Sequence, residues 1–322
     1  MELTRLSPRA LRAATEALRA RQPVHLRLDA RPTQGPPLDE IVPLCTTVSS
    51  PDPALAGWLR TLQAPPPSPC DAAVTAVIPT HQRVPLGLPA LLAQDASVRV
   101  LIVSNGPGGP REAPGAAVLR LPWRGHGLTR QAAVAHVKTP YTLLTVDDAI
   151  PLGGGFVRTM VSALEAGRWD AVFARQIPWP DADPETKRRL RQWTPPGRAV
   201  VAAPQVDHVA ALYRTESLRR WPLPDVPIAE DAWWSRGRRI GYVPMAPVLH
   251  SHARIPAALY ARNRDIHTEL IKMGEPARVP STTSMLRSMP STLRPLLRGE
   301  RREALCRAAE LLGQWQAARR VL

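Results

Sequence analysis

The chain has 322 residues and a formal net charge of +15, from 42 basic and 27 acidic side chains. No apolar run approaches the roughly 20 residues that a membrane-spanning helix needs. The Arg-rich N-terminus lacks the apolar core of a secretory signal, so we expect a cytoplasmic protein. Three isolated cysteines argue against a disulfide framework and a zinc site. The positive charge suits nucleic acid, an anionic membrane surface or a phosphorylated substrate.

Residues 1–70 are predicted to form an N-terminal extension without recognisable chemistry. Ser7 and Pro8 can begin a helix, and residues 24–28 alternate like a strand. A second helix is predicted from Asp52 onwards. The proline-rich run at 65–69 is typical of a stiff linker, and it marks the predicted domain boundary.

From Ala73 onwards, short apolar runs alternate with helical patterns, which predicts a mostly parallel α/β sheet with helices on both sides. Strands are predicted at 74–78, 98–103, 117–121, 141–146, 170–174, 206–213, 240–243 and 248–252. A long loop with a short basic helix is predicted at 176–204, and such loops are usually functional lids or disordered. In open α/β sheets, ligands bind beyond the carboxyl ends of the strands, so the polar residues there are candidate site residues.

Two adjacent carboxylates, Asp147 and Asp148, follow the strand that begins at Tyr141. Neighbouring carboxylates in a crevice repel each other unless a positive group lies between them, and a divalent cation with its phosphates is the usual partner. The alternative is an ordinary polar turn, in which aspartate is common.

Residues 255–322 are predicted to form a basic helical C-terminal region. It contains one helix around Leu259, a basic and proline-punctuated stretch from Arg278 to Arg298, and a last helix that includes Leu305. One interpretation is an arm that lies against the inner face of an anionic membrane and suits a lipid-linked acceptor. The other is a helix packed on the main domain or on a partner.

Six motifs, each at a strand end or a helix start, resemble those of the family 2 glycosyltransferases in their order. They are residues 77–83, 103–106, 127–131, 147–149, 230–234, and 250–252 together with 259–262. The resemblance implies the GT-A fold, a Rossmann-like parallel sheet flanked by helices, over residues 71–254. It also implies a transferase of the EC 2.4 class, which moves a sugar with inversion from a nucleotide-diphosphate sugar to an acceptor hydroxyl.

The chain departs from the family pattern at two places. Where the family usually has an aspartate that contacts the nucleotide base, this chain has Ser104 and Asn105. The third position of the D-x-D region is Ala149, which leaves two carboxylates. The identities of the base, the sugar and the acceptor stay open; the acceptor can be a glycan, a lipid-linked saccharide, a peptide or a small molecule.

The resemblance assigns a metal site to the chain. A departing diphosphate needs a cation, and oxygen ligands suit Mg²⁺ or Mn²⁺. Asp148 is the candidate metal ligand, and Asp147 would contact the ribose or share the metal. His250 or His252 would complete the coordination, since imidazole tolerates manganese. The alternative for each histidine is a strand-end residue that bonds to a neighbour.

The acceptor hydroxyl must lose a proton, so the reaction needs a carboxylate within hydrogen-bond reach. Asp231 is the candidate base, and Glu230 would orient it or bind an acceptor hydroxyl. Trp233 and Trp234 would stack on acceptor sugar rings. The alternatives are a helix with acids in its first turn and two tryptophans that pack in the core.

The remaining candidates would bind the donor. Arg130 would clamp the diphosphate or bond the ribose region, and Arg254 and Arg262 would hold the leaving phosphates. The full set predicted to bind the nucleotide sugar is Pro79, Thr80, Arg83, Ser104, Asn105, Arg130 and Asp147.

Two other functions stay open. A nucleotidyltransferase that makes sugar nucleotides has a similar sheet, but it usually carries a Gly-rich loop with Lys or Arg after the first strand, and residues 79–83 contain no such loop. A non-catalytic basic protein that binds RNA or a membrane would show no metal-dependent nucleotide binding and a steep salt dependence. Nucleic acid is not the expected partner.

Overall fold

A computed structural model describes the chain except for residues 33–36, 67, 275–294, 296, 299 and 322. The chain divides into two compact units. The first comprises Met1–Trp123, Thr129–Pro222 and Ser235–His252, and the second comprises Arg124–Leu128, Leu223–Trp234 and Ala253–Leu322. The division into domains at residues 70 and 254 stays a prediction.

Most of the predicted basic stretch from Arg278 to Arg298 lies outside the described residues. Among the residues that are described, no helix combines the length and the apolar character that a membrane crossing requires.

The first 62 residues form a small α/β layer with its own apolar core. Three parallel strands lie in the order β1-β2-β3: β1 (Glu2–Leu3), β2 (His25–Arg27) and β3 (Thr47–Ser49). The helical elements are α1 (Pro8–Arg19), α2 (Leu38–Ile41), the 3₁₀ turn η1 (Val42–Leu44) and α3 (Pro53–Leu62). The predicted helix starts are confirmed, because the side chains of Ser7 and Asp52 accept hydrogen bonds from the first turns of α1 and α3. Strands β1 and β3 are too short to show an alternating pattern in the sequence.

A nine-stranded sheet forms the centre of the first unit, as far as the chain is described. Its strands are β4 (Ala73–Thr80), β5 (Ser97–Ser104), β6 (Ala116–Arg120), β7 (Tyr141–Thr145), β8 (Ile150–Pro151), β9 (Ala171–Ile177), β10 (Val201–Ala203), β11 (Ala210–Arg214) and β12 (Ile240–Leu249). The order is β10-β12-β9-β11-β7-β4-β5-β6, with β8 paired to β12. The ladders make β4, β5, β6, β7, β9 and β12 run in one direction, while β8, β10 and β11 run the other way. The predicted mostly parallel sheet is therefore confirmed.

Burial on both faces explains the continuous apolar runs of these strands. Val74, Ala76 and Ile78 of β4 pack on one face in a single core with helices α4 (Leu88–Leu92) and α6 (Phe156–Ala166). The first unit also contains α7 (Pro184–Trp193) and α8 (Thr215–Arg220), and α5 (His126–Val134) belongs to it from Thr129 onwards.

The sheet differs from the prediction at several strands. The sequence predicts neither β8 nor β10, β11 begins at Ala210 and not at residue 206, and two predicted strands are one. The sequence predicts separate strands at 240–243 and 248–252, because Pro244 and Pro247 interrupt the run. The structure has one strand, β12, whose register against β9 shifts between Val243 and Pro247. Prolines that cannot donate to a ladder are tolerated at such an irregularity, so the chain continues through them.

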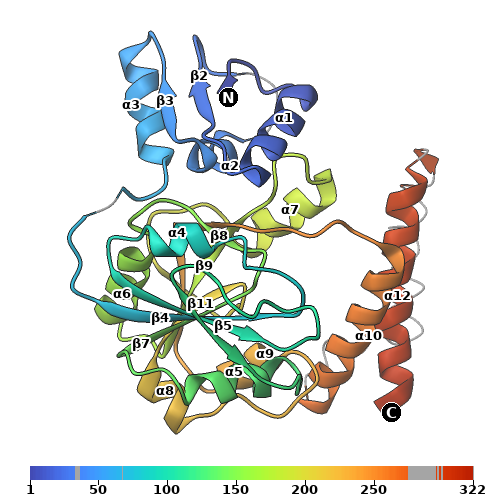
Figure 1. The fold of residues 1–322 in the computed structure, drawn as a ribbon. Coiled ribbons are helices and arrows are strands. Elements are labelled where there is room, and N and C mark those ends of the chain that lie inside the picture. The colour runs from blue at the N-terminus through green and yellow to red at the C-terminus, as the bar shows by residue number, and fades with distance from the viewer. Residues whose placement is uncertain (33–36, 67, 275–294, 296, 299, 322) are drawn as a thin grey trace. The chain divides into compact units, whose positions relative to one another are not determined.

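Two long helices dominate the second unit, and they run side by side (Figure 1): α10 (Pro256–Lys272) and α12 (Arg301–Val321). They approach closely at Gly313, where an added Cβ would lie 2.4 Å from the carbonyl oxygen of Tyr260. Helix α9 (Glu230–Ser235) begins in this unit, and Ala232 packs with Leu270 and Met273 in a small core.

Candidate metal centre

The ligand-facing edge of the sheet follows from the strand directions. Because β4, β5, β7, β9 and β12 run the same way, their carboxyl ends lie at one edge, and the reversed strand β11 begins at that edge. Asp148 follows β7, His250 follows β12, and Asp207 precedes β11. Residues that are distant in the sequence therefore meet there.

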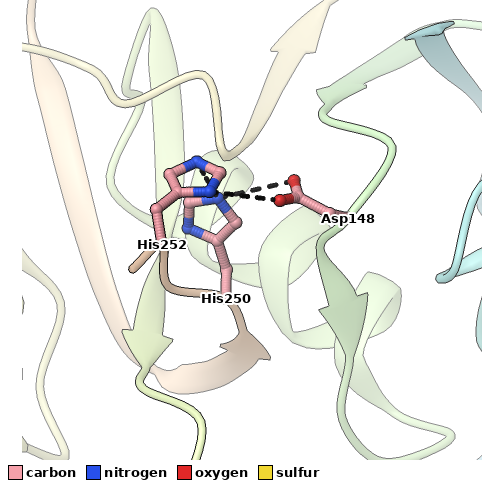
Figure 2. A group of neighbouring side chains, drawn as sticks. All are labelled: Asp148, His250 and His252. Carbon is pink, nitrogen blue, oxygen red and sulfur yellow. Dashed lines mark hydrogen bonds and ion pairs between the residues drawn. The ribbon is translucent and has the colours of Figure 1, made fainter. Parts of the chain in front are cut away.

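Asp148, His250 and His252 form a group whose ligand atoms all lie within 4.8 Å of one another. Figure 2 shows the carboxylate of Asp148 facing both imidazole rings. His250 Nε2 lies 3.5 Å from Asp148 Oδ1 and 3.2 Å from His252 Nε2, and His252 Nδ1 lies 3.4 Å from Asp148 Oδ2. Ligands roughly 2.1 Å from one ion lie roughly 3 Å apart, so this spacing fits a shared cation.

The three side chains differ in exposure: 8% for His250, 19% for Asp148 and 57% for His252. His250 is held on two sides, since its backbone N–H donates to Ile177 O at 2.9 Å and its Nδ1 lies 2.9 Å from Gln176 Oε1. Two imidazoles with one carboxylate are donors that suit a transition-metal ion such as Mn²⁺ better than Mg²⁺, which prefers oxygen ligands. Of the two metals that the sequence suggested, the chemistry of the donor set thus favours Mn²⁺ over Mg²⁺.

The neighbouring carboxylate, Asp147, is engaged elsewhere and is not part of this group. Thr80 Oγ1, at the end of β4, donates to Asp147 Oδ2 at 2.7 Å, and Arg83 Nε lies 3.9 Å from the same oxygen. Of the two adjacent acids, Asp148 faces the histidines and Asp147 faces β4. Pro79 precedes Thr80 on this strand and is half-buried.

Ser104 and Asn105, at the end of β5, are buried polar residues with exposed fractions of 3% and 7%. The Asn105 backbone N–H donates to Thr80 O at 3.0 Å. Neither Ser104 Oγ nor either polar atom of the Asn105 amide has a hydrogen-bond partner within the described part of the chain. A buried polar group without a partner costs about 1–3 kcal/mol, so this place calls for a polar ligand.

Arg130, on α5, is buried with 4% exposure. It is therefore not an ordinary surface arginine. It belongs to the same unit as the metal group, and its contact with the donor stays a prediction.

Glu230, Asp231, Trp233 and Trp234 belong to the second unit, so their convergence with the metal group stays a prediction. Asp231 is half-buried in the first turn of α9, and its Oδ1 accepts from the Ala232 N–H at 2.8 Å. Glu230 and Trp234 are buried, whereas Trp233 is half-buried and packs beside Ile266.

The two arginines predicted to hold the diphosphate differ in their surroundings. The Arg254 guanidinium is buried and bonds to the carboxylates of Glu303 and Glu310 on α12. Arg262 is exposed on α10. Arg254 already has two acidic partners that would compete with a phosphate, so Arg262 is the more accessible of the pair.

The sequence interpretation missed two residues beside His250. Gln176 is the penultimate residue of β9, and its Nε2 donates to Asp207 Oδ2 at 2.6 Å. The strand predicted at 170–174 ends before Gln176, which the sequence therefore assigns to a loop. The strand predicted at 206–213 includes Asp207, which in the structure precedes β11. No local signal corrects this, because the contact depends on the reversed direction of β11.

No protein-family model and no curated protein matches this sequence. Among solved structures, the mannosyltransferase PcManGT from Pyrobaculum calidifontis, in complex with GDP-Man and Mn²⁺, is similar with a TM-score of 0.52 and 15% identity. The similarity covers 94% of this chain and 97% of that one.

Two further solved structures are more distant. GalNAc-T7 with UDP, GalNAc and Mn²⁺ has a TM-score of 0.43 and 11% identity, and covers 56% of this chain and 44% of its own. A fragment of S. aureus TarS with UDP-GlcNAc has a TM-score of 0.42 and 14% identity, and covers 77% and 90%. The mannosyltransferase match and the sheet order together show that the chain has a GT-A-like α/β fold, with a mostly parallel sheet and C-terminal helices.

Proposed function

We propose that this protein is a glycosyltransferase that moves a sugar from a nucleotide-diphosphate sugar to an acceptor hydroxyl, with a divalent cation held by Asp148, His250 and His252. The observation that carries the proposal is the convergence of these side chains at the carboxyl edge of a GT-A-like sheet. The mannosyltransferase with a similar fold was solved with GDP-Man and Mn²⁺, which supports this donor class and this metal.

A bound Mn²⁺ ion would neutralise the charge that develops on the departing diphosphate. The chain's part is to present the two imidazoles and one carboxylate without reorganisation. His250 supports this role best, because its ring is 8% exposed and bonded on the side away from Asp148.

The nucleoside is proposed to lie across the ends of β4, β5 and β7. Asn105 offers a donor and an acceptor on one amide, so it can pair with a base edge that carries both. Thr80 orients Asp147 toward this place, and Arg83 adds a positive charge beside it. Arg130 is the proposed contact for the ribose or the diphosphate.

Asp231 is the proposed base, with inversion at the anomeric carbon, as in the family 2 enzymes. Ala229, just before this acid pair, has φ +64, a conformation that costs a residue with a Cβ about 1–2 kcal/mol. Such strain is commonly retained at functional turns, which supports a role for the segment. Trp233 is the proposed stacking surface for an acceptor sugar.

Calorimetry tests the proposal most directly. GDP, UDP, GDP-mannose and UDP-GlcNAc are titrated into the full chain with and without Mn²⁺, and one nucleotide family is expected to bind only with the metal. Asp148→Ala should abolish this binding, whereas Asp170→Asn, which changes an acid at the opposite end of β9, should not. If all the nucleotides bind weakly, without dependence on Mn²⁺ and with a steep salt dependence, the protein is instead a basic binding protein.

A further inference from the structure

Three polar side chains from neighbouring strands form a hydrogen-bonded chain that ends at His250. Asp207 precedes β11, Gln176 lies on β9 and His250 follows β12, and β9 is the strand between the other two. Gln176 Nε2 donates to Asp207 Oδ2 at 2.6 Å, and Gln176 Oε1 lies 2.9 Å from His250 Nδ1. Gln176 and His250 are buried, and Asp207 is half-buried.

The carboxylate at one end decides the direction of every bond in this chain. An ionised carboxylate can only accept hydrogen bonds, and Asp207 accepts three, from Gln176 Nε2, Trp193 Nε1 and the Val209 N–H. The NH₂ group of Gln176 must therefore face Asp207, and its carbonyl oxygen must face His250. A carbonyl oxygen also only accepts, so the proton of the neutral imidazole resides on Nδ1.

With the proton on Nδ1, the lone pair of the ring is on Nε2. Nε2 is the atom that faces the metal group, 3.5 Å from Asp148 Oδ1 and 3.2 Å from His252 Nε2. We infer that Asp207 and Gln176 are positioning residues, which hold His250 in the one neutral tautomer that can bind a metal at this place. This inference rests on the proposed metal site.

The arrangement matches the general behaviour of metal-binding histidines, whose second ring nitrogen donates to an oxygen acceptor. Removing such a partner typically lowers metal affinity about 10–100-fold. His252 makes a useful contrast within the same group, because its ring is 57% exposed and water can satisfy either nitrogen. The hydrogen-bonded chain from Asp207 through Gln176, called the relay from here on, therefore acts on His250.

A purely structural role is the competing explanation, since the same bonds also join three strands. Structural crosslinking predicts a loss of stability and no effect on the tautomer. The two roles separate in ¹⁵N NMR of the metal-free protein, at a pH where the imidazole is neutral, because the protonated and unprotonated ring nitrogens differ strongly in chemical shift.

The test replaces Gln176 with a side chain of similar length that has no NH₂ group and only a weakly accepting sulfur atom. Gln176→Met is expected to weaken Mn²⁺ binding in calorimetry by about 10–100-fold and to populate the Nε2–H tautomer of His250. The unmodified protein should show Nδ1–H alone. Gln22→Met, the same change at an exposed position of the N-terminal extension, is the matched control and should alter neither reading.

A double substitution provides the rescue. In Gln176→Glu with Asp207→Asn, the carboxylate introduced at position 176 accepts from His250 Nδ1–H and from the amide introduced at position 207. Net charge and the tautomer are both preserved, and only the bond from Trp193 Nε1, which shares Asp207 Oδ2 with Gln176, is lost. Mn²⁺ affinity should therefore return to within about 5-fold of the original.

The outcomes separate this inference from the proposed function. If the unmodified protein binds no Mn²⁺, the metal site itself is wrong. If it binds Mn²⁺ while metal-free His250 carries its proton on Nε2, or if Gln176→Met leaves both the affinity and the tautomer unchanged, the relay is wrong. The NMR reading on the unmodified protein decides the point even if the Met variant fails to fold.

Discussion

The ligand edge of the central sheet has two differently prepared regions. At the ends of β7, β9 and β12, polar side chains bond to one another in a continuous series from Asp207 through Gln176 and His250. At the end of β5, the polar atoms of Ser104 and Asn105 have no partners within the described residues. The first region is organised before anything binds, and the second carries a desolvation cost that a polar ligand would offset.

The comparison shows that buried polar groups can have two different effects at one edge of the sheet. Buried groups that satisfy each other fix the orientation of His250. Buried groups that stay unsatisfied trade stability for binding, which is the usual balance at functional sites. The predictions below test whether the two regions differ in this way.

Loss of the metal group should have the largest effect. Asp148→Ala is expected to lower Mn²⁺-dependent sugar transfer by roughly a thousandfold or more, because a metal ion supplies several kcal/mol of charge stabilisation. EDTA should lower the rate of sugar transfer by the unmodified protein to a similar extent, and added Mn²⁺ should restore that rate. Turnover measured with radiolabelled donors checks this, and normal turnover in the folded variant would falsify the metal-assisted mechanism.

A substitution at the end of β5 should change stability and nucleotide binding in opposite directions. Asn105→Leu is close in size and removes both unpartnered atoms, so it is expected to raise the free energy of unfolding by about 1 kcal/mol. Nucleoside-diphosphate affinity should fall roughly tenfold, since the bonds to the base are lost. Denaturant unfolding and calorimetry measure the two effects, while the affinity for Mn²⁺ alone should not change. A destabilised variant with unchanged nucleotide affinity would show that this asparagine serves the fold.

A smaller effect is expected at the far end of the relay. Trp193→Phe removes the Nε1–H that donates to Asp207 Oδ2 at 2.9 Å but keeps an aromatic ring against Phe173. Gln176 still faces the carboxylate, so Mn²⁺ affinity should fall only about 2–5-fold, less than in Gln176→Met. Equal losses in the two variants would mean that the site senses packing and not hydrogen bonding.

The last effect concerns the stability of the N-terminal layer and not the metal group. Arg191 Nη1 lies 3.0 Å from Glu40 Oε1 and 3.1 Å from Asp39 Oδ2, and Arg175 also pairs with Asp39. Burial raises the pKa of the Glu40 carboxyl, and the bond from Arg191 partly counters this. Arg191→Met should therefore destabilise the protein by about 1 kcal/mol, since Arg191 is 39% exposed and partly screened.

The loss should depend on pH. A raised pKa means that Glu40 contributes its stability fully below the pKa of the unfolded chain and loses it as the pH rises through the folded pKa. Without Arg191 that pKa rises further, so the variant should be more destabilised at pH 8 than at pH 4.5. Thermal melts at both values measure this, with the exposed Arg198→Met as the control; an equal loss at both pH values would contradict it.

Some features of the fold and of the site depend on neighbouring residues alone and can therefore be predicted from the sequence. The apolar runs of β4, β5 and β7 report burial on both faces of a sheet, and polar residues at their ends indicate the ligand edge. Asp148 stands out because a second carboxylate adjoins it. The candidate histidines required the resemblance as well, because a histidine at a strand end carries no specific signal alone.

The sequence by itself determined the sheet, its helices and the polar edge, because periodicity and turn chemistry are properties of neighbouring residues. Only the tertiary structure decided that Asp148 and not Asp147 faces the histidines, that Gln176 meets Asp207, and that Arg254 is already paired with acids. These contacts join residues tens of positions apart. Those at the sheet edge depend on strand order and on the reversal of β11, and that of Arg254 depends on the position of α12 beside α10. None of these is encoded in the pattern of any single segment.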